Sequence, residues 1–261
     1  MKTLRNFSLE LGRLLQSRLT WLVLLLTVIS PVAGLTLYKP ATAETMLSMY
    51  LANPAIAGGV VSGILFGLLT VYELDRSGRS RVDILMNAIV SPMRSALIRM
   101  LALIVTSLLG LILTMLVWLP VSFTQAGSVL DMTNYCLAYL LFMGLALPCS
   151  ILAAAACYQF TQRADLSIIL FAAFAALSLT IWADNWQLCW LNPCVWALSG
   201  DFTNYRIFRS VLYMRLTWLA ALGGVWGLSW CCIRQHGKGL FGSLLRSSRR
   251  VYRPVIAVLL I

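Results

Sequence analysis

The chain has 261 residues, of which 60% are hydrophobic and only 11% are charged, and its mean hydropathy is +0.85. Soluble domains carry roughly 25% charged and about 45–50% apolar residues, so this composition excludes a soluble globular fold and a disordered chain. The 20 Lys and Arg against 9 Asp and Glu give a net charge of +11, and these charges lie between apolar blocks. That placement favours contact with lipid head groups over contact with nucleic acid.

Six apolar blocks of about 18–27 residues follow one another, and this length crosses a hydrocarbon core of about 30 Å as a helix. They predict an all-α, polytopic helical membrane protein with six transmembrane helices. The predicted spans are 20–38, 46–72, 96–119, 134–160, 166–183 and 211–233. The chain then divides into an N-terminal segment 1–18, a six-helix domain 19–233 and a basic tail 234–261 with an apolar end.

The N-terminal segment 1–18 has its apolar residues on one helical face and its charged residues on the others. The apolar positions are Leu4, Phe7, Leu11, Leu14 and Leu15. This pattern predicts an amphipathic helix that lies in the membrane interface, with its basic residues toward the head groups.

The second predicted span, 46–72, has a small residue at every fourth position: Ala55, Gly59, Gly63 and Gly67. Small residues on one stripe let two helix backbones approach closely in a membrane. Two interpretations stay open, a mobile helix–helix interface that lines a path and a static, closely packed contact.

A polar loop at 73–94 follows this span and contains a short amphipathic helix, because apolar residues recur there at i, i+3, i+4 and i+7. These residues are Val82, Leu85, Met86 and Ile89. Pro92 is expected to end that helix. The flanking charges include Glu73 and Arg79, which are either solvated or part of a binding surface.

The distribution of Lys and Arg predicts the orientation in the membrane. The N-terminal segment, the 73–94 loop and the tail are the most basic, so both termini and that loop are expected in the cytoplasm of a cell-membrane protein, and 184–210 outside. One stretch departs from this pattern, because three arginines fall on the predicted outer side: Arg206, Arg209 and Arg215.

Several catalytic chemistries are missing from the sequence. It has no phosphate-binding G-x-x-x-x-G-K-[ST] loop, no H-E-x-x-H and no G-x-S-x-G, and its one histidine is His236. We therefore expect no enzyme activity, no metal and no cofactor. The central portions of the six spans also lack charged residues, which argues against proton-coupled transport.

With these features the chain resembles the permease subunit of ABC-2-type exporters, the membrane subunits of ABC transporters. That family has an interfacial N-terminal helix, six spans, a coupling helix between the second and third spans, and a re-entrant outer segment before the last span. Residues in the order of the family pattern are Glu73, Arg76, Gly78, Leu85, Pro92 and Arg94, and the pair Asn192–Pro193 resembles its outer segment.

The resemblance implies transport driven by a separate ABC ATPase subunit and a second permease subunit, identical or different, as a dimer partner. It implies coupling to the ATPase through Glu73, Arg79, Val82, Leu85, Met86, Ile89 and Pro92. In the outer segment 184–210, Trp186 and Trp190 are either an aromatic belt or a lid over an exit path, and Cys189 and Cys194 are either bridged or free. The rival interpretations are a non-transport membrane protein (an immunity, sensor or assembly factor) and a channel.

Overall fold

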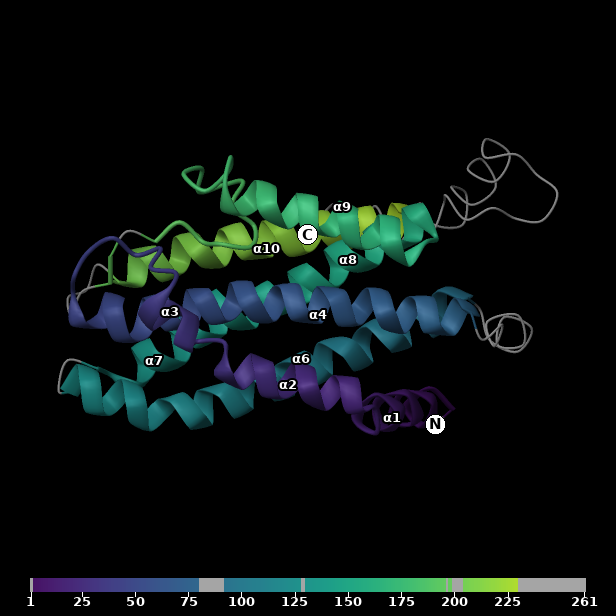
Figure 1. Ribbon diagram of the computed structural model, residues 1–261, viewed down its shortest axis with the longest axis horizontal. Helices are drawn as coiled ribbons and strands as arrows, with labels where there is room; N and C mark the ends of the chain where they lie inside the picture. Colours follow the sequence, from purple (N-terminus) through teal and green to yellow (C-terminus); the bar gives the residue numbers. More distant parts are fainter. Residues whose placement is uncertain (1, 80–91, 128–129, 196, 199–203, 230–261) are drawn as a thin grey trace.

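A computed structural model describes residues 2–79, 92–127, 130–195, 197–198 and 204–229 (Figure 1). Within these ranges the chain is helical and contains no strand, so the predicted all-α class is confirmed. The α-helices are α1 (Lys2–Leu15), α2 (Arg18–Ile29), α3 (Val32–Thr36), α4 (Asn53–Arg79), α6 (Pro92–Ala126), α7 (Met132–Ala138), α8 (Ala146–Thr161), α9 (Ala164–Leu179) and α10 (Asn204–Ser229). Two π-helical turns, η1 (Ser48–Ala52) and η3 (Tyr139–Gly144), precede α4 and α8.

Five helical stretches of the described chain are long and apolar enough to cross a membrane. They are Arg18–Thr36, Ser48–Arg76, Arg94–Ala126, Met132–Thr161 and Asn204–Ser229. The predicted span 166–183 corresponds to α9, an apolar helix of 16 residues. At 1.5 Å per residue α9 rises about 24 Å, which is less than a hydrocarbon core of about 30 Å. By length and composition, the described chain therefore has five candidate membrane spans.

Several helices extend beyond the predicted apolar blocks. Helix α4 continues into the predicted loop 73–94 as far as Arg79, and α6 begins at Pro92, which was expected to end a loop helix. Proline is tolerated in the first turn of a helix, where its missing N–H has no intrahelical partner. Hydropathy marks only the part of a helix that lies in lipid, so it underestimates the length of helices whose ends are polar.

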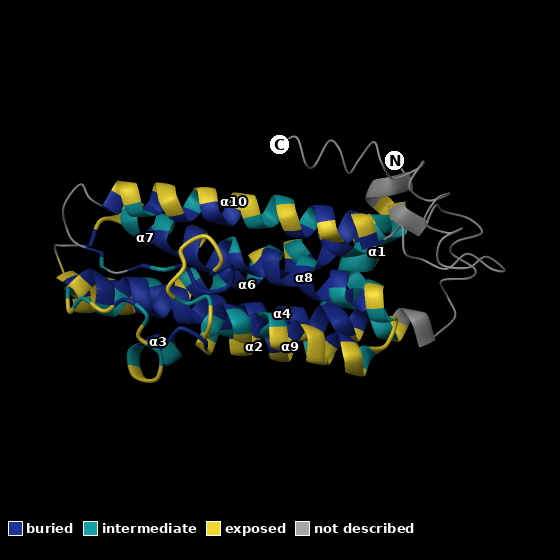
Figure 2. Ribbon diagram, turned by 90° about the horizontal axis from the view of Figure 1, so that it is seen from above, coloured by how far each residue is buried: buried dark blue, intermediate teal, exposed yellow. Residues whose placement is uncertain are grey.

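Helix α4 runs lengthwise through the middle of the molecule, with α2 and α6 on one side and α9 and α10 on the other (Figure 1). In each of the spans formed by η1–α4 and by α7–α8, 72% of the most apolar 18-residue stretch is buried. In the spans formed by α2–α3, α6 and α10, the buried share of that stretch is 39%, 44% and 33%. Figure 2 shows the same contrast, with α4 and α8 mostly buried and α10 exposed along its outer face. The bundle is thus built around the α4–α8 pair.

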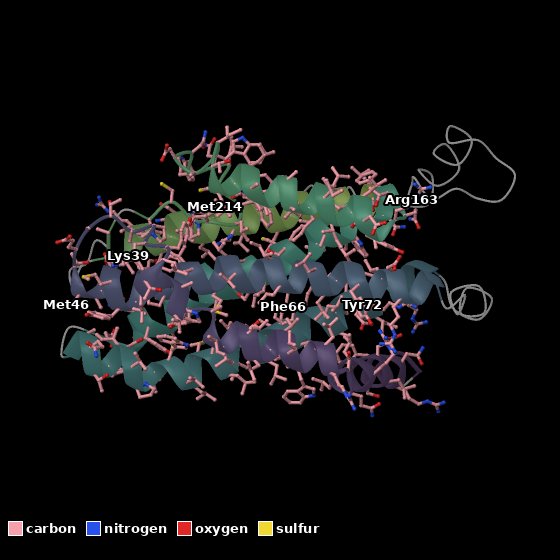
Figure 3. All side chains as sticks on the ribbon, viewed as in Figure 1. Lys39, Met46, Phe66, Tyr72, Arg163 and Met214 are labelled. Carbon is pink, nitrogen blue, oxygen red and sulfur yellow. The ribbon has the colours of Figure 1, made fainter. Side chains whose placement is uncertain are left out.

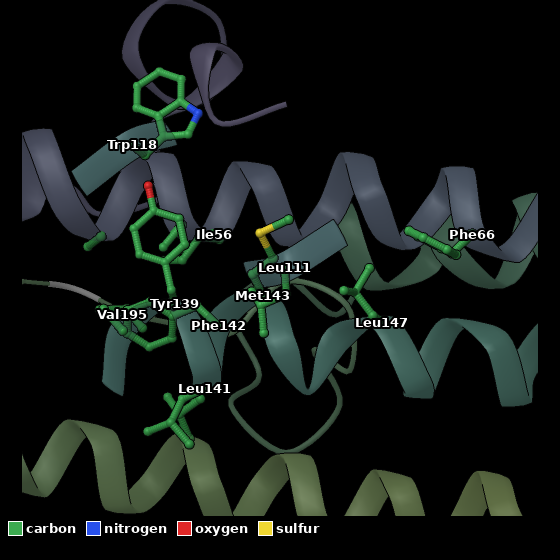
Figure 4. Close-up of a cluster of buried hydrophobic side chains, with 14 of the residues drawn as sticks. Ile56, Phe66, Leu111, Trp118, Tyr139, Leu141, Phe142, Met143, Leu147 and Val195 are labelled. Atoms are coloured by element: carbon green, nitrogen blue, oxygen red, sulfur yellow. The ribbon is translucent and has the colours of Figure 1, made fainter. Parts of the chain in front are cut away.

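The main apolar core lies between α4, α6, η3 and α8 (Figure 4). Aromatic side chains fill much of it, and Tyr135 and Tyr139 pack with ring centroids 4.8 Å apart. Val195, which follows α9 by 16 residues in the sequence, belongs to the same cluster. The segment between α9 and α10 therefore takes part in the core.

Two prolines coincide with irregular helical geometry. Helix α2 ends at Ile29, just before Pro31, and α3 resumes at Val32. Pro148 lies in the first turn of α8, directly after the π-helical turn η3, where the Leu145 N–H donates to the carbonyl of Leu140 over 3.1 Å. A proline interrupts the regular hydrogen-bond ladder of a helix, which accounts for both deviations.

The two ends of the bundle differ in charge. Figure 3 places Lys39 and Met46 at one end and Tyr72 and Arg163 at the other. The second end also holds α1, the end of α4 and the start of α6, and with them most arginines of the described chain: Arg5, Arg13, Arg18, Arg76, Arg94 and Arg99. Helix α1 packs against α6 there, with Leu14 buried and Leu9 exposed.

The small-residue stripe of α4 packs inside the chain. Ala55 is fully buried, and a Cβ atom at Gly59 would lie 2.6 Å from the carbonyl oxygen of Phe142. At Gly63 it would lie 2.6 Å from the Ser150 hydroxyl oxygen. At Gly67 it would overlap the ring of Phe171. The stripe therefore allows close packing of α4 against η3, α8 and α9.

We predict that Gly63→Leu destabilises the folded chain itself, because its side chain has no room against Ser150 and Leu191. Overpacking of this kind costs roughly 1–3 kcal/mol. Thermal unfolding in detergent should show a lower Tm. Gly12→Ala is the matched control, since nothing lies within 4 Å of a Cβ at that position. An unchanged Tm for Gly63→Leu would contradict the packing described above.

Candidate functional site

The chain between α9 and α10 folds back into the bundle and forms the first of two candidate functional regions. Trp190 and Leu191 are fully buried, and the Leu191 side chain lies against Gly63 of α4. The Trp190 ring stacks on Phe174 of α9 with centroids 4.8 Å apart, and its Nε1 donates to the Phe174 carbonyl over 3.3 Å. These contacts hold the segment between α4 and α9.

Arg215 of α10 is fully buried and binds backbone carbonyls of this segment. Its Nη1 donates to the carbonyl of Trp190, and its Nη2 donates to the carbonyl of Leu191 over 3.2 Å. The same Nη2 donates to the carbonyl of Phe142 in η3 over 3.1 Å. One guanidinium group therefore joins α10, the segment before it and the π-helical turn.

The depth of this contact follows from the position of Arg215 in its helix. At 1.5 Å per residue, Arg215 lies about 16 Å from the start of α10 at Asn204 and about 21 Å from its end at Ser229. Irregular backbone at such a depth is tolerated only where the protein satisfies its polar groups. Serines contribute here too, since Ser178 Oγ accepts from the Leu191 N–H over 3.0 Å and Ser48 Oγ accepts from the Leu198 N–H over 2.8 Å.

The structure corrects one sequence-based expectation at Arg215. The spans were expected to lack charge in their central portions, but α10 begins at Asn204 and not near residue 211, so Arg215 lies buried near the middle of this candidate span. The outer-side position of Arg215 stays a prediction. The helical spacing of buried residues was the sequence signal for the burial of Arg215. Arg215 lies on one face of α10 with Phe208, Val211 and Leu222, all of which are buried.

The residues predicted for the outer segment have different environments. Trp186 is 54% exposed, which fits an aromatic belt, whereas Trp190 is buried and does not. Asn192 and Pro193 are both buried, and the side-chain oxygen of Asn192 has no hydrogen-bond partner within the described chain. Cys189 and Cys194, for which a disulfide was one alternative, are free thiols.

The second candidate region is a cluster of charges at the arginine-rich end, where α1, α4 and α6 meet. Glu73 of α4 is buried, and one of its carboxylate oxygens lies 2.8 Å from Nη1 of Arg13 in α1. Arg76 Nη1 lies 3.7 Å from the other oxygen. Glu10 accepts from Arg13 Nε over 2.9 Å and lies 3.8 Å from Arg99 Nε of α6. This ionic cluster is defined by Glu10, Arg13, Glu73, Arg76 and Arg99.

The ionic cluster keeps Arg13 charged. Partial burial lowers the pKa of Arg13, but its hydrogen bond to Glu10 and the negative charge of Glu73 outweigh that effect and raise the pKa above its ordinary value. Arg13 is thus charged at every accessible pH, and it holds the buried Glu73 carboxylate against α1.

The residues predicted to couple to an ATPase are only partly described. Glu73 is buried in the ionic cluster and is not a solvated loop charge. Arg79 is the last residue of α4, and Pro92 is the first residue of α6. The predicted coupling-helix residues Val82, Leu85, Met86 and Ile89 lie outside the described residues.

A groove of about 530 Å³ runs between α4 and α9 near the arginine-rich end. Its wall is apolar, with Leu68, Val71 and Ile168, and its mouth is polar, with Tyr72, Asp75 and Arg76.

Nothing in the described chain gathers three or more His, Cys, Asp or Glu side chains as a metal site would require. Comparisons with protein-family models, with curated proteins and with solved structures found no match to this chain.

We predict that Glu73→Gln loosens α1 from the bundle, because the substitution removes the charge that Arg13 and Arg76 face. Loss of the buried partner of an ion pair costs about 1–3 kcal/mol. Limited proteolysis of detergent-solubilised protein should show faster cleavage within α1. Arg5→Gln on the exposed face of the same helix is the control and should leave the cleavage rate unchanged. Equal cleavage rates in the two variants would show that the Arg13–Glu73 ion pair does not hold α1.

Proposed function

We propose that this chain is the membrane-spanning permease subunit of an ATP-driven ABC exporter of the ABC-2 type. The observation that carries the proposal is the buried Glu73 carboxylate, which ties the end of α4 to α1 a few residues before the segment 80–91. A force applied to that segment reaches α4 directly through the backbone. It reaches α1 and, through Glu10, α6 by way of the ionic cluster.

Helix α4 connects the two candidate regions. Glu73 is ten residues from Gly63, a distance of about 15 Å along a helix. Gly63 contacts Leu191 and Gly59 contacts the Phe142 carbonyl, so a shift of α4 acts on the segment that Arg215 binds. A glycine stripe favours such a shift because α4 adds no side chain of its own at these positions.

The groove between α4 and α9 supports transport of a cargo with an apolar part. Its apolar wall and polar mouth suit an amphipathic molecule that enters from the membrane near the arginine-rich end. Helix α9 completes the set of six spans in this proposal. Its 16 residues are long enough where the charged ends of neighbouring helices thin the bilayer.

In this proposal the chain resides in the cell membrane with both termini and the arginine-rich end in the cytoplasm, as the excess of basic residues there favours. A separate ABC ATPase subunit binds and hydrolyses ATP, and a second permease subunit completes the membrane dimer. ATP-driven approach of two ATPases pushes the segments between α4 and α6, and this chain contributes no catalytic residue.

Topology is the first test of the proposal. Cysteine labelling with an impermeant maleimide, or reporter fusions, should place residues 73–94 and 234–253 inside and Gly200 outside. The expectation follows from the excess of basic residues at 73–94 and in the tail. A cytoplasmic signal at Gly200 would contradict the six-span arrangement.

Association with an ATPase is the second test. Leu85 is central in the apolar stripe of 82–89, so Leu85→Asp removes apolar burial of about 1.5–3 kcal/mol and adds a charge that is costly to desolvate. In detergent, tagged wild-type protein should recover a P-loop ATPase and the Leu85→Asp variant should not.

Leu9→Asp is the matched control for that experiment, because Leu9 is 63% exposed on α1 and takes no part in the ionic cluster. It should recover the ATPase as the wild type does. Equal recovery with Leu85→Asp would remove the coupling assignment. Failure of the wild type to recover any ATPase would favour a non-transport membrane protein.

A further inference from the structure

Within the described part of the chain, three buried polar atoms in the region around Leu191 have no hydrogen-bond partner. They are Nε of Arg215, Oγ of Ser150 and the side-chain oxygen of Asn192. Ser150 and Leu191 lie against the same position, Gly63, and Asn192 follows Leu191 in the chain. None of the ion pairs in the described chain includes Arg215, and within that part of the chain its hydrogen bonds go to backbone carbonyls.

This arrangement is poorly suited to a permanent core. An unpaired polar group in an apolar interior destabilises the state that buries it, and a charge does so more strongly. Intramembrane charges accordingly mark functional positions. Besides its contacts with Phe174, Ser178 and Gly63, the segment is held by the guanidinium group of Arg215. A second arrangement is open to it, in which its carbonyls exchange Arg215 for water and the side-chain oxygen of Asn192 gains a partner.

We propose that residues 189–192 form a displaceable plug at mid-depth in the bundle and that Arg215 is the positioning residue that holds the plug closed. In the closed state Leu191 fills the space beside Gly63, and Trp190 stacks on Phe174. Outward movement breaks the bonds from Arg215 to Trp190 and Leu191 and uncovers the glycine stripe of α4. This inference rests on the exporter proposal only for the cargo that passes the plug. The plug itself and its closing residue belong to this chain.

Two native cysteines report on the plug. Cys189 is buried at its start, and Cys149 is buried in α8, in the same apolar cluster as Trp190. Movement of the plug exposes Cys189 and leaves Cys149 covered, whereas general loosening of the bundle exposes both. The experiment is N-ethylmaleimide labelling of the full chain in detergent, with the rate at each cysteine followed by peptide mass spectrometry. It needs no ATPase, so its outcome is independent of the ATPase recovery test.

In the wild type we expect slow labelling at both positions. Arg215→Gln should raise the rate at Cys189 about tenfold or more, the factor that corresponds to ~1.4 kcal/mol, and leave Cys149 unchanged. Arg215→Lys keeps the charge but loses the fork that binds three carbonyls, so its rate should lie between those of the wild type and Arg215→Gln. An unchanged rate at Cys189, or an equal rise at both cysteines, overturns the proposal.

A second variant decides the matter if Arg215→Gln does not accumulate. Ser178→Ala removes the acceptor of the Leu191 N–H on α9 and leaves Arg215 intact. It should raise labelling at Cys189 alone, to a smaller extent than Arg215→Gln. If Cys189 in Ser178→Ala is as protected as in the wild type, residues 189–192 are a fixed part of the core and not a plug.

Discussion

In the hydrocarbon core of a membrane every backbone N–H and C=O needs a partner from the protein, and much of this structure follows from that constraint. Residues 189–195, between α9 and α10, are not helical, yet Trp190 and Leu191 lie near the middle of the bundle. Arg215 supplies donors for their carbonyls, and serines of η1 and α9 supply acceptors for the N–H groups of Leu191 and Leu198. These side chains satisfy backbone groups that burial of the segment would otherwise leave unpaired.

Helix α4 connects the contact between Arg215 and the buried segment to the arginine-rich end of the molecule. Its glycines bring the backbone close enough for Gly63 to meet Leu191 and for Gly59 to meet the carbonyl that Arg215 binds. Ten residues beyond Gly63, the same helix carries Glu73, which Arg13 holds against α1. A rigid helix with small residues at one position and a buried charge at another transmits displacement between them. The exporter proposal and the plug proposal both depend on this geometry, but they are tested by separate experiments.

The small-residue stripe shows how one sequence pattern serves two interpretations. Spacing by four residues predicted close packing, and the structure has such packing within the chain, against η3, α8 and α9. Whether the contact is static or slides is a question of the free-energy difference between two packed states. That difference depends on the polar groups around Leu191, which come from α8, α10 and the segment between α9 and α10. No stripe on a single helix contains that information.

The sequence by itself determined the helical membrane class and most span positions, because hydropathy and helical period are local properties. Through the family resemblance it also pointed to Asn192 and Pro193 as outer-segment residues, but it did not predict their contacts. Only the tertiary structure decided the places of Arg215 and Glu73, which sequence reasoning left as an outer charge and a loop charge. Their burial depends on partners 24 or more residues away, namely Trp190, Leu191 and Phe142 for the arginine and Arg13 for the glutamate. A buried charge is stable only beside its partners, and those are set by the packing of helices and not by the local pattern.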